Sequence, residues 1–134
     1  MSARQLGYLD SALFVYALFP HDERYARCHA ILAELQTGDA EGVIDPLVFQ
    51  ELTTILPTLR QFPDRPAVAR YLRGLLSARG VLADQRDLLL AALLRWTERG
   101  GSFVEAWIAI IALTEGRTVC APDRDDFPDV ANAY

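Results

Sequence analysis

Short apolar segments alternate along the chain with longer segments whose apolar positions recur at helical spacing. The short segments predict buried strands at residues 6–9, 42–44, 80–83 and 118–121. The longer segments predict helices at residues 11–19, 22–36, 45–56, 67–78, 84–98 and 103–113. Strands that alternate with helices in this way form parallel sheets with helices on both faces. The pattern therefore predicts an α/β fold with a short central parallel sheet flanked by helices.

Aspartate residues precede three of the predicted helices. Asp22, Asp45 and Asp84 each stand just before a helical segment, and Asp is among the preferred N-cap residues. Pro46 follows Asp45 at the first helical position, where proline is well tolerated. We therefore interpret Asp45 and Asp84 as helix caps and not as candidates for chemistry.

The length and composition of the chain are those of one domain. Its 134 residues are 51% hydrophobic, so we expect a single domain spanning residues 1–134. The longest apolar run, residues 103–113, is shorter than the roughly 18 residues of a membrane span. The first residues lack the pattern of a signal peptide, so we expect a cytoplasmic protein without a membrane partner. Cys28 and Cys120 are too few for a disulfide framework or a zinc motif, and we expect two reduced thiols.

All 13 basic residues are arginine, and the sequence contains no lysine. This composition excludes a Walker A phosphate loop, a Schiff-base enzyme and a receiver-type phosphoacceptor site, each of which needs a lysine. The formal net charge of -5 argues against binding nucleic acid through a broad basic face. Nucleic-acid chemistry would instead require metal ions, a local arginine cluster or a partner.

Three acidic residues stand apart in apolar surroundings, and a fourth follows a predicted strand. Asp10 is the only charged residue between Gln5 and Pro20, and it follows the first predicted strand. Glu51 and Glu105 have mainly apolar neighbours on their helices, and Asp123 follows the last predicted strand. An unpaired buried carboxylate costs several kcal/mol, so such residues indicate a bound cation or a partner. Because ligands bind at the carboxyl ends of parallel strands, we expect the four acids to share one pocket there and to bind one or two Mg²⁺ or Mn²⁺ ions.

Each acid also has a purely structural interpretation. Asp10 would cap the helix that follows it, and Glu51 would be an ordinary helix acid. Glu105 would interact favourably with the helix dipole in the first turn of its helix. Asp123 competes with Asp125 and Asp126 as a ligand, and all three would otherwise cap a short turn.

Four sequence blocks resemble the acidic blocks of PIN domains, in their order and spacing and over nearly the whole chain. They are Leu9-Asp10-Ser11, Phe49-Gln50-Glu51-Leu52, Phe103-Val104-Glu105-Ala106 and residues Val119 to Phe127. The likeness is to the small bacterial PIN ribonucleases, including VapC toxins. It implies a three-layer α/β/α PIN-like fold and a Mg²⁺-dependent (or Mn²⁺-dependent) endoribonuclease acting on RNA, with Asp10, Glu51, Glu105 and Asp123 as metal-binding and catalytic acids. It also implies a homodimer and a small antitoxin protein as partners.

Two positions depart from the PIN pattern. The third block usually carries Asp where this chain has Glu105, whose side chain is one methylene longer. The Ser or Thr common two residues before the last acid is replaced by Ala121. Both departures would weaken metal binding or change the preferred ion, and they are the reason to keep a non-cutting PIN-fold binding or regulatory protein as the alternative. A phosphatase is a weaker alternative, because Asp10-Ser11-Ala12 lacks the second acid two residues after a phosphorylated Asp.

RNA capture by an acidic protein needs basic residues around the acids. Pairing two copies of the chain would place arginines such as Arg60, Arg70, Arg73 or Arg124 around a shared groove. An antitoxin peptide could insert an arginine among the four acids and compete with the metal. We therefore expect a homodimer, with an antitoxin as a further partner.

Overall fold

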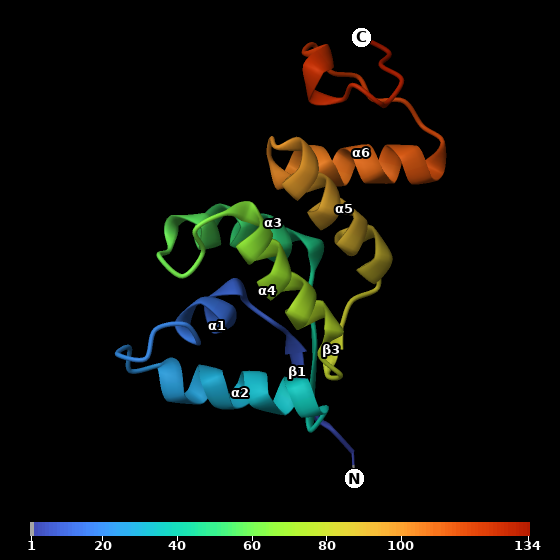
Figure 1. Cartoon of the computed structure of the whole chain (residues 1–134). Helices are drawn as coiled ribbons and strands as arrows, with labels where there is room; N and C mark the ends of the chain where they lie inside the picture. The colour runs from blue at the N-terminus through green and yellow to red at the C-terminus, as the bar shows by residue number, and fades with distance from the viewer. Residues whose placement is uncertain (1) are drawn as a thin grey trace. The chain divides into compact units, whose positions relative to one another are not determined.

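The computed structural model describes residues 2–134 (Figure 1). Helices and strands alternate along the first part of the chain, as the sequence predicts. The elements, in chain order, are β1 (Arg4–Tyr8), α1 (Ser11–Tyr16), α2 (Tyr25–Thr37), β2 (Ala40–Val43), α3 (Pro46–Ile55), the 3-10 helix η1 (Leu56–Thr58), α4 (Arg65–Ser77), β3 (Val81–Leu82), α5 (Arg86–Arg99), α6 (Phe103–Glu115) and the 3-10 helix η2 (Arg124–Asp126). No helix within residues 2–134 is both long enough and apolar enough to cross a membrane.

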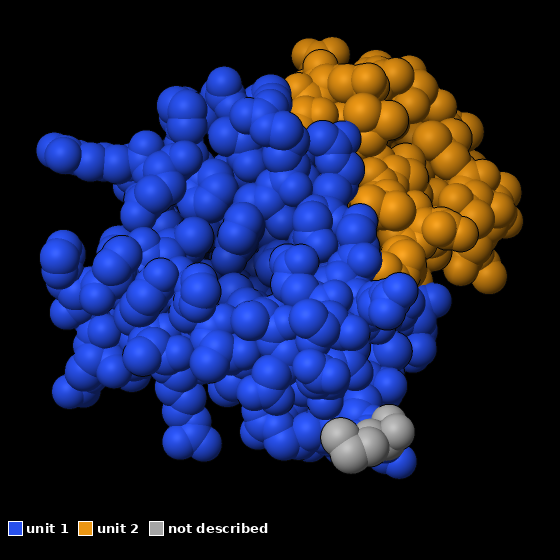
Figure 2. All heavy atoms as spheres, turned by 60° about the horizontal axis from the view of Figure 1, so that its bottom comes forward, with its two compact units in different colours: residues 1–84 blue, residues 85–134 orange. Residues whose placement is uncertain are grey.

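The chain divides into two compact units, which Figure 2 colours separately. Unit 1 extends to Asp84 and contains the sheet with α1 to α4. Unit 2 runs from Gln85 to Tyr134 and contains α5, α6 and η2. The expectation of a single domain over residues 1–134 stays a prediction.

The sheet of unit 1 is short and parallel, with strand order β1-β2-β3. Arg4 pairs with Ala40 at one end of the first ladder, and Gly42 pairs with Val81 in the second. Gly42 is required there because a Cβ would come 2.5 Å from Leu9 Cδ2. Helix α2 packs against β2 and α4 packs against β3, whereas α1 contacts both α2 and α3. The predicted α/β class, with a short central parallel sheet flanked by helices as in a three-layer α/β/α fold, is confirmed.

Capping residues position the helices of unit 1 on an apolar core. Asp45 accepts a hydrogen bond from the Leu47 backbone N–H at 2.9 Å, so its predicted role as a helix cap is confirmed. Asp64 caps α4 in the same way, through the N–H of Ala67 at 2.9 Å. The largest fully buried side chains of this core come from all four helices, their flanking residues and the strands: Phe14, Phe49, Leu35, Ile44, Leu52, Leu56, Leu72, Leu76, Val68 and Val81.

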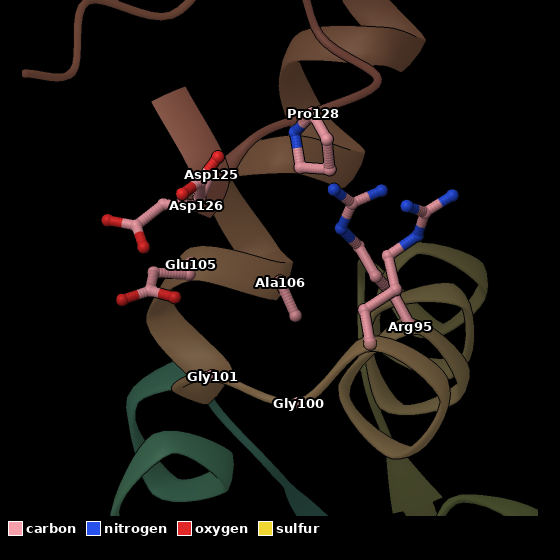
Figure 3. Close-up of a pocket in the computed structure, with 9 residues that line it drawn as sticks. Arg95, Gly100, Gly101, Glu105, Ala106, Asp125, Asp126 and Pro128 are labelled. Atoms are coloured by element: carbon pink, nitrogen blue, oxygen red, sulfur yellow. The ribbon is translucent and has the colours of Figure 1, made fainter. Parts of the chain in front are cut away.

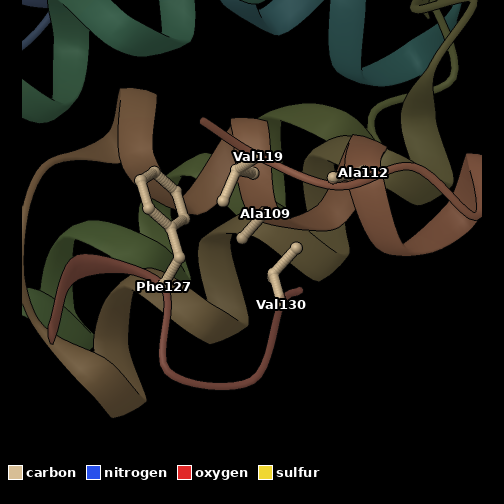
Figure 4. Close-up of a cluster of buried hydrophobic side chains, with 5 residues drawn as sticks. All are labelled: Ala109, Ala112, Val119, Phe127 and Val130. Carbon is tan, nitrogen blue, oxygen red and sulfur yellow. The ribbon is translucent and has the colours of Figure 1, made fainter. Parts of the chain in front are cut away.

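Unit 2 packs α5 against α6 and covers α6 with the C-terminal segment. Figure 4 shows the resulting apolar cluster, in which side chains of that segment meet the small residues of α6. Its buried members are Ala109, Ala112, Val119, Phe127 and Val130. The side chain of Asn132 completes the packing, because it donates to the Ala121 carbonyl at 2.9 Å and accepts from the Ala121 N–H at 3.2 Å.

Three local predictions are wrong. Residues 118–121 are not a strand of the sheet, because Val119 forms only an isolated bridge with Asn132 in its own unit. Asp84 does not cap α5, whose N-cap position is taken by Gln85. Asp22 does not cap α2, which begins at Tyr25; its carboxylate instead binds Arg24 and thereby has its pKa lowered to about 2.

Candidate functional site

Asp10 lies two residues after the end of β1 and immediately before α1. It occupies the N-cap position of α1 with extended backbone angles, but its side chain makes no capping hydrogen bond. The residue is exposed. The carboxylate is therefore not used for capping, and it stands at the strand end where the sequence predicts it.

Ser11 connects the first two acidic blocks. Its hydroxyl donates a hydrogen bond to Glu51 Oε1 at 2.5 Å, across 40 positions of the sequence. Ser11 is buried, being only 3% exposed, so its hydroxyl is directed by packing. Glu51 lies on α3, which contacts α1. Unit 1 thus brings Glu51 beside the residue that follows Asp10.

Glu105 lies in the first turn of α6, and its backbone helps to form the helix cap. Ser102 occupies the N-cap position, and its hydroxyl accepts a hydrogen bond from the Glu105 backbone N–H at 3.1 Å. The half-buried side chain of Glu105 lies over Gly101, where an added Cβ would come 2.5 Å from Glu105 Oε2. Gly101 also has a φ of +76°, which favours glycine. The longer acid at this position is therefore accommodated by a residue without a side chain.

Asp123 has a capping role at η2. Its Oδ1 accepts a hydrogen bond from the Asp125 backbone N–H at 3.0 Å. Asp125 and Asp126, which the sequence identifies as competing ligands, both line the pocket that contains Glu105. In unit 2, the acids that accompany Glu105 in the pocket are therefore those of η2 itself.

This pocket of unit 2, called here the α5–α6 pocket, has a volume of about 410 Å³. Its acidic side is formed by Glu105, Asp125 and Asp126, and its basic side by Arg95 and Arg99 at the end of α5. Figure 3 shows the carboxylates of Glu105 and Asp126 on one side and Arg95 on the other. The pocket therefore presents both signs of charge to a ligand.

An ion pair holds the basic side in place. Arg95 donates to both carboxylate oxygens of Asp129, at 2.6 Å each, and its side chain is only 9% exposed. The hydrogen bond from Arg95 lowers the pKa of Asp129 to about 2, and the same contact raises the pKa of Arg95. Arg99 reaches Asp129 only at 3.5 Å, and its side chain is 48% exposed. Asp129 thus neutralises one arginine and leaves the other largely unengaged.

The sequence does not predict Arg95, Arg99 or Asp129 as part of a site. The arginines were detectable in principle, because they lie four positions apart and therefore on one face of the same helix. Asp129 was not, because no local pattern connects it to a helix that ends 30 positions earlier. The arginines considered for a groove, Arg60, Arg70, Arg73 and Arg124, do not line this pocket.

The burial argument is wrong for Asp10 and Glu51. Both residues are exposed, as is Asp123, whereas Glu105 is half-buried. Isolation from other charges in the sequence does not imply burial, because these residues lie at helix and strand ends or on a helix face open to water.

The donor chemistry of the α5–α6 pocket fits a hard divalent cation. Its acidic side offers only carboxylate oxygens, which Mg²⁺ and Mn²⁺ prefer. Within residues 2–134, no three or more acidic, histidine or cysteine side chains gather closely enough to form a preformed metal cage. Mg²⁺ commonly takes one or two carboxylates and keeps water on its remaining positions, so a preformed cage is not required.

The four predicted acids are divided between the two units. Asp10 and Glu51 belong to unit 1, and Glu105 and Asp123 belong to unit 2. That all four share one pocket stays a prediction. No known family model matches the chain, and no curated protein matches it.

Proposed function

We propose that this protein is a Mg²⁺- or Mn²⁺-dependent endoribonuclease of the PIN type, with Asp10, Glu51, Glu105 and Asp123 as its metal-binding and catalytic acids. The observation that carries this proposal is the α5–α6 pocket, in which carboxylates stand opposite arginines. Metal-assisted cleavage of a polyanion needs oxygen ligands for the cation and positive charge for the phosphate. This pocket offers both.

In unit 1, the surroundings of Asp10 and Glu51 support the proposal that both residues bind metal. The hydroxyl of Ser11 holds one oxygen of Glu51 and thereby restricts the orientation of that carboxylate. Asp10 makes no capping hydrogen bond and keeps its oxygens available. Orienting hydrogen bonds of this kind are typical around metal-ligating carboxylates.

The proposed reaction is hydrolysis of an RNA phosphodiester. A bound divalent cation supplies a Lewis acid that makes water acidic and stabilises charge on the phosphate oxygens. The four acids named above would hold that cation. Asp125 and Asp126 line the pocket beside Glu105, where they would orient the attacking water and accept its proton. Water attacks phosphorus in line with the leaving oxygen, and no covalent bond to the enzyme forms.

The proposal also covers the location of the protein and its partners. We place the protein in the cytoplasm, as a homodimer that acts on RNA and is inhibited by a small antitoxin, in the manner of a VapBC-like pair. Support comes from the net charge of -5, which makes RNA capture by one copy unfavourable, and from apolar residues on the surface of α6. Val104, Ile108 and Leu113 are 43%, 43% and 47% exposed.

A PIN-fold protein that binds without cutting is the second candidate. It is favoured by the two departures from the PIN pattern, at Glu105 and Ala121. At Ala121 the backbone is held by Asn132, so this segment is ordered without the hydroxyl that PIN domains commonly carry there.

A metal titration followed by an RNA-cleavage assay tests the proposal. The full chain should cleave a single-stranded RNA with Mg²⁺ or Mn²⁺ and stop when EDTA is added. Glu105→Gln should lose at least about 100-fold in rate. Glu23→Gln, which changes an exposed glutamate before α2, is the matched control and should cleave like the wild type. Metal binding without any cleavage would favour the non-cutting candidate, and neither binding nor cleavage would contradict both.

A further inference from the structure

We propose that Arg99 contacts a phosphate of the bound RNA in the α5–α6 pocket, while Arg95 serves to hold the pocket wall. This inference rests on the proposed function, because it names how that site would bind its substrate. It gives different roles to two arginines that lie one helical turn apart on α5. The two roles differ because the two arginines contact Asp129 at different distances and are buried to different extents.

Arg95 is committed to the protein. Both of its terminal nitrogens donate to Asp129 at 2.6 Å, in the parallel geometry that a carboxylate and a guanidinium favour. Its side chain is 9% exposed, so little of it is left to meet a ligand. Since Asp129 lies in the C-terminal segment, this pair holds that segment against α5. Arg95 therefore shapes the pocket and contributes little free positive charge.

Arg99 retains most of its binding capacity. Its one contact with Asp129 is long, at 3.5 Å, and goes to an oxygen that already accepts from Arg95. Its side chain is 48% exposed, and it lines the pocket. Two arginines and one carboxylate leave a net charge of +1 on this wall. That charge lies on the guanidinium with free donors, which is Arg99.

The surroundings favour a phosphate as the ligand of Arg99. The planar guanidinium matches the spacing of two phosphate oxygens. Gly100, beside Arg99, has nothing within 4 Å of the position that a Cβ would take, so the floor of the pocket is open. The acids on the opposite side would repel an anion unless the cation that Glu105 would help to hold lies beside them. A phosphodiester between Arg99 and such a cation satisfies both sides of the pocket, so RNA binding should depend on the divalent cation.

Binding of a short fluorescent single-stranded RNA, measured by anisotropy with the full chain, tests this inference. Asp10→Asn serves as the parent, so that bound RNA stays intact, and Mg²⁺ is present at a saturating level. Adding Arg99→Ala should weaken binding about tenfold. It should also reduce the steepness of the plot of log binding constant against log salt concentration by about 0.7, the value for one phosphate contact on a single strand. Arg99→Lys should recover part of the loss. Arg117→Ala, at an exposed arginine outside this pocket, is the matched control and should change binding little.

Asp129→Asn separates phosphate binding from a purely structural role. If Arg99 contacts phosphate, removing the negative charge frees positive charge, while the amide oxygen of residue 129 can still accept a hydrogen bond from Arg95 and hold the pocket wall. Folded Asp129→Asn should then bind RNA at least as tightly as the parent. If Arg99 only holds Asp129, then Asp129→Asn and Arg99→Ala should lose affinity together, which would overturn the inference. Unchanged affinity in Arg99→Ala, or no RNA binding by the parent, would also overturn it. Binding that depends on Arg99, in a protein whose wild type cuts no RNA, would leave this inference standing and reject the proposed cleavage.

Discussion

The hydroxyl of Ser11 donates to Glu51 Oε1 at 2.5 Å and is itself buried. This hydrogen bond joins the start of α1 to the middle of α3, two elements that are separated by a strand and a helix in the sequence. Because Ser11 follows Asp10, the bond places Glu51 beside the residue next to Asp10. We therefore propose Ser11 as a positioning residue for the Glu51 carboxylate.

Ser11→Ala should weaken Mg²⁺ binding and RNA cleavage by about tenfold or more, because Glu51 loses the donor that orients it. The fold should remain, since the change removes one hydroxyl and leaves no large cavity. Mg²⁺ titration calorimetry and the cleavage rate measure the effect. Ser77→Ala is the matched control, because the exposed Ser77 hydroxyl donates to the Arg73 carbonyl of its own helix. Equal metal affinity in both variants would reject a positioning role for Ser11.

Gly101→Ala should displace the Glu105 carboxylate and lower Mg²⁺ affinity, because the new Cβ would come 2.5 Å from Glu105 Oε2. Gly100→Ala is a close control. Both glycines have nearly the same positive φ, +77° and +76°, which L side chains rarely adopt, so both variants should lose about 1–3 kcal/mol of stability. Only Gly101 lies against Glu105, since a Cβ on Gly100 would meet nothing within 4 Å.

Shortening the acid should relieve that clash. In Gly101→Ala/Glu105→Asp the carboxylate no longer extends over residue 101, so Mg²⁺ affinity should rise above that of Gly101→Ala alone. Titration with Mg²⁺ of the wild type, Gly100→Ala, Gly101→Ala and Gly101→Ala/Glu105→Asp measures these affinities. The same loss of affinity in Gly100→Ala and Gly101→Ala would show that backbone strain, and not contact with Glu105, is responsible.

The Arg95–Asp129 ion pair should stabilise the C-terminal segment in a pH-dependent way. The pKa of Asp129 lies below its ordinary value, so this stabilisation is complete above about pH 4 and is lost as the pH falls toward 2. At pH 7, Asp129→Asn should lower the free energy of unfolding by about 1–2 kcal/mol, because hydrogen bonds to charged groups are strong but partial exposure to water screens this one.

Urea unfolding of the wild type and Asp129→Asn between pH 3 and pH 7 measures this effect. The difference between them should shrink as the pH is lowered. Glu115→Gln breaks a more exposed ion pair, with Arg117, and should cost less than about 0.5 kcal/mol at every pH. A difference for Asp129→Asn that did not depend on pH would contradict the assignment of its stability to the ion pair.

Local patterns in the sequence were sufficient for most of unit 1. The first three predicted strands overlap β1, β2 and β3 in turn, and the Asp45-Pro46 pair identifies the start of α3 correctly. Strand positions and helix starts depend mainly on residues that are close together in the sequence, so a local pattern is enough to predict them. The position of Asp10 after the first strand follows from the same local logic.

Contacts between distant residues could not be predicted in this way. The segment at residues 118–121 has the apolar character of a strand, but Val119 pairs with Asn132 in the C-terminal segment and does not join the sheet. The arginine–aspartate pair at the α5–α6 pocket joins residues 34 positions apart. Both are set by tertiary packing, which no periodic pattern records.

We propose that Asp10 and Glu105 act in the same metal-dependent cleavage of RNA. Single-turnover cleavage of a labelled single-stranded RNA, compared for wild type, Asp10→Asn, Glu105→Gln and the double variant, tests this proposal. Each single variant should lose at least about 100-fold in rate, and the double variant should lose hardly more, since the effects of residues that act as a unit are not additive. Full Mg²⁺-dependent activity in Asp10→Asn, or losses that multiply in the double variant, would contradict it.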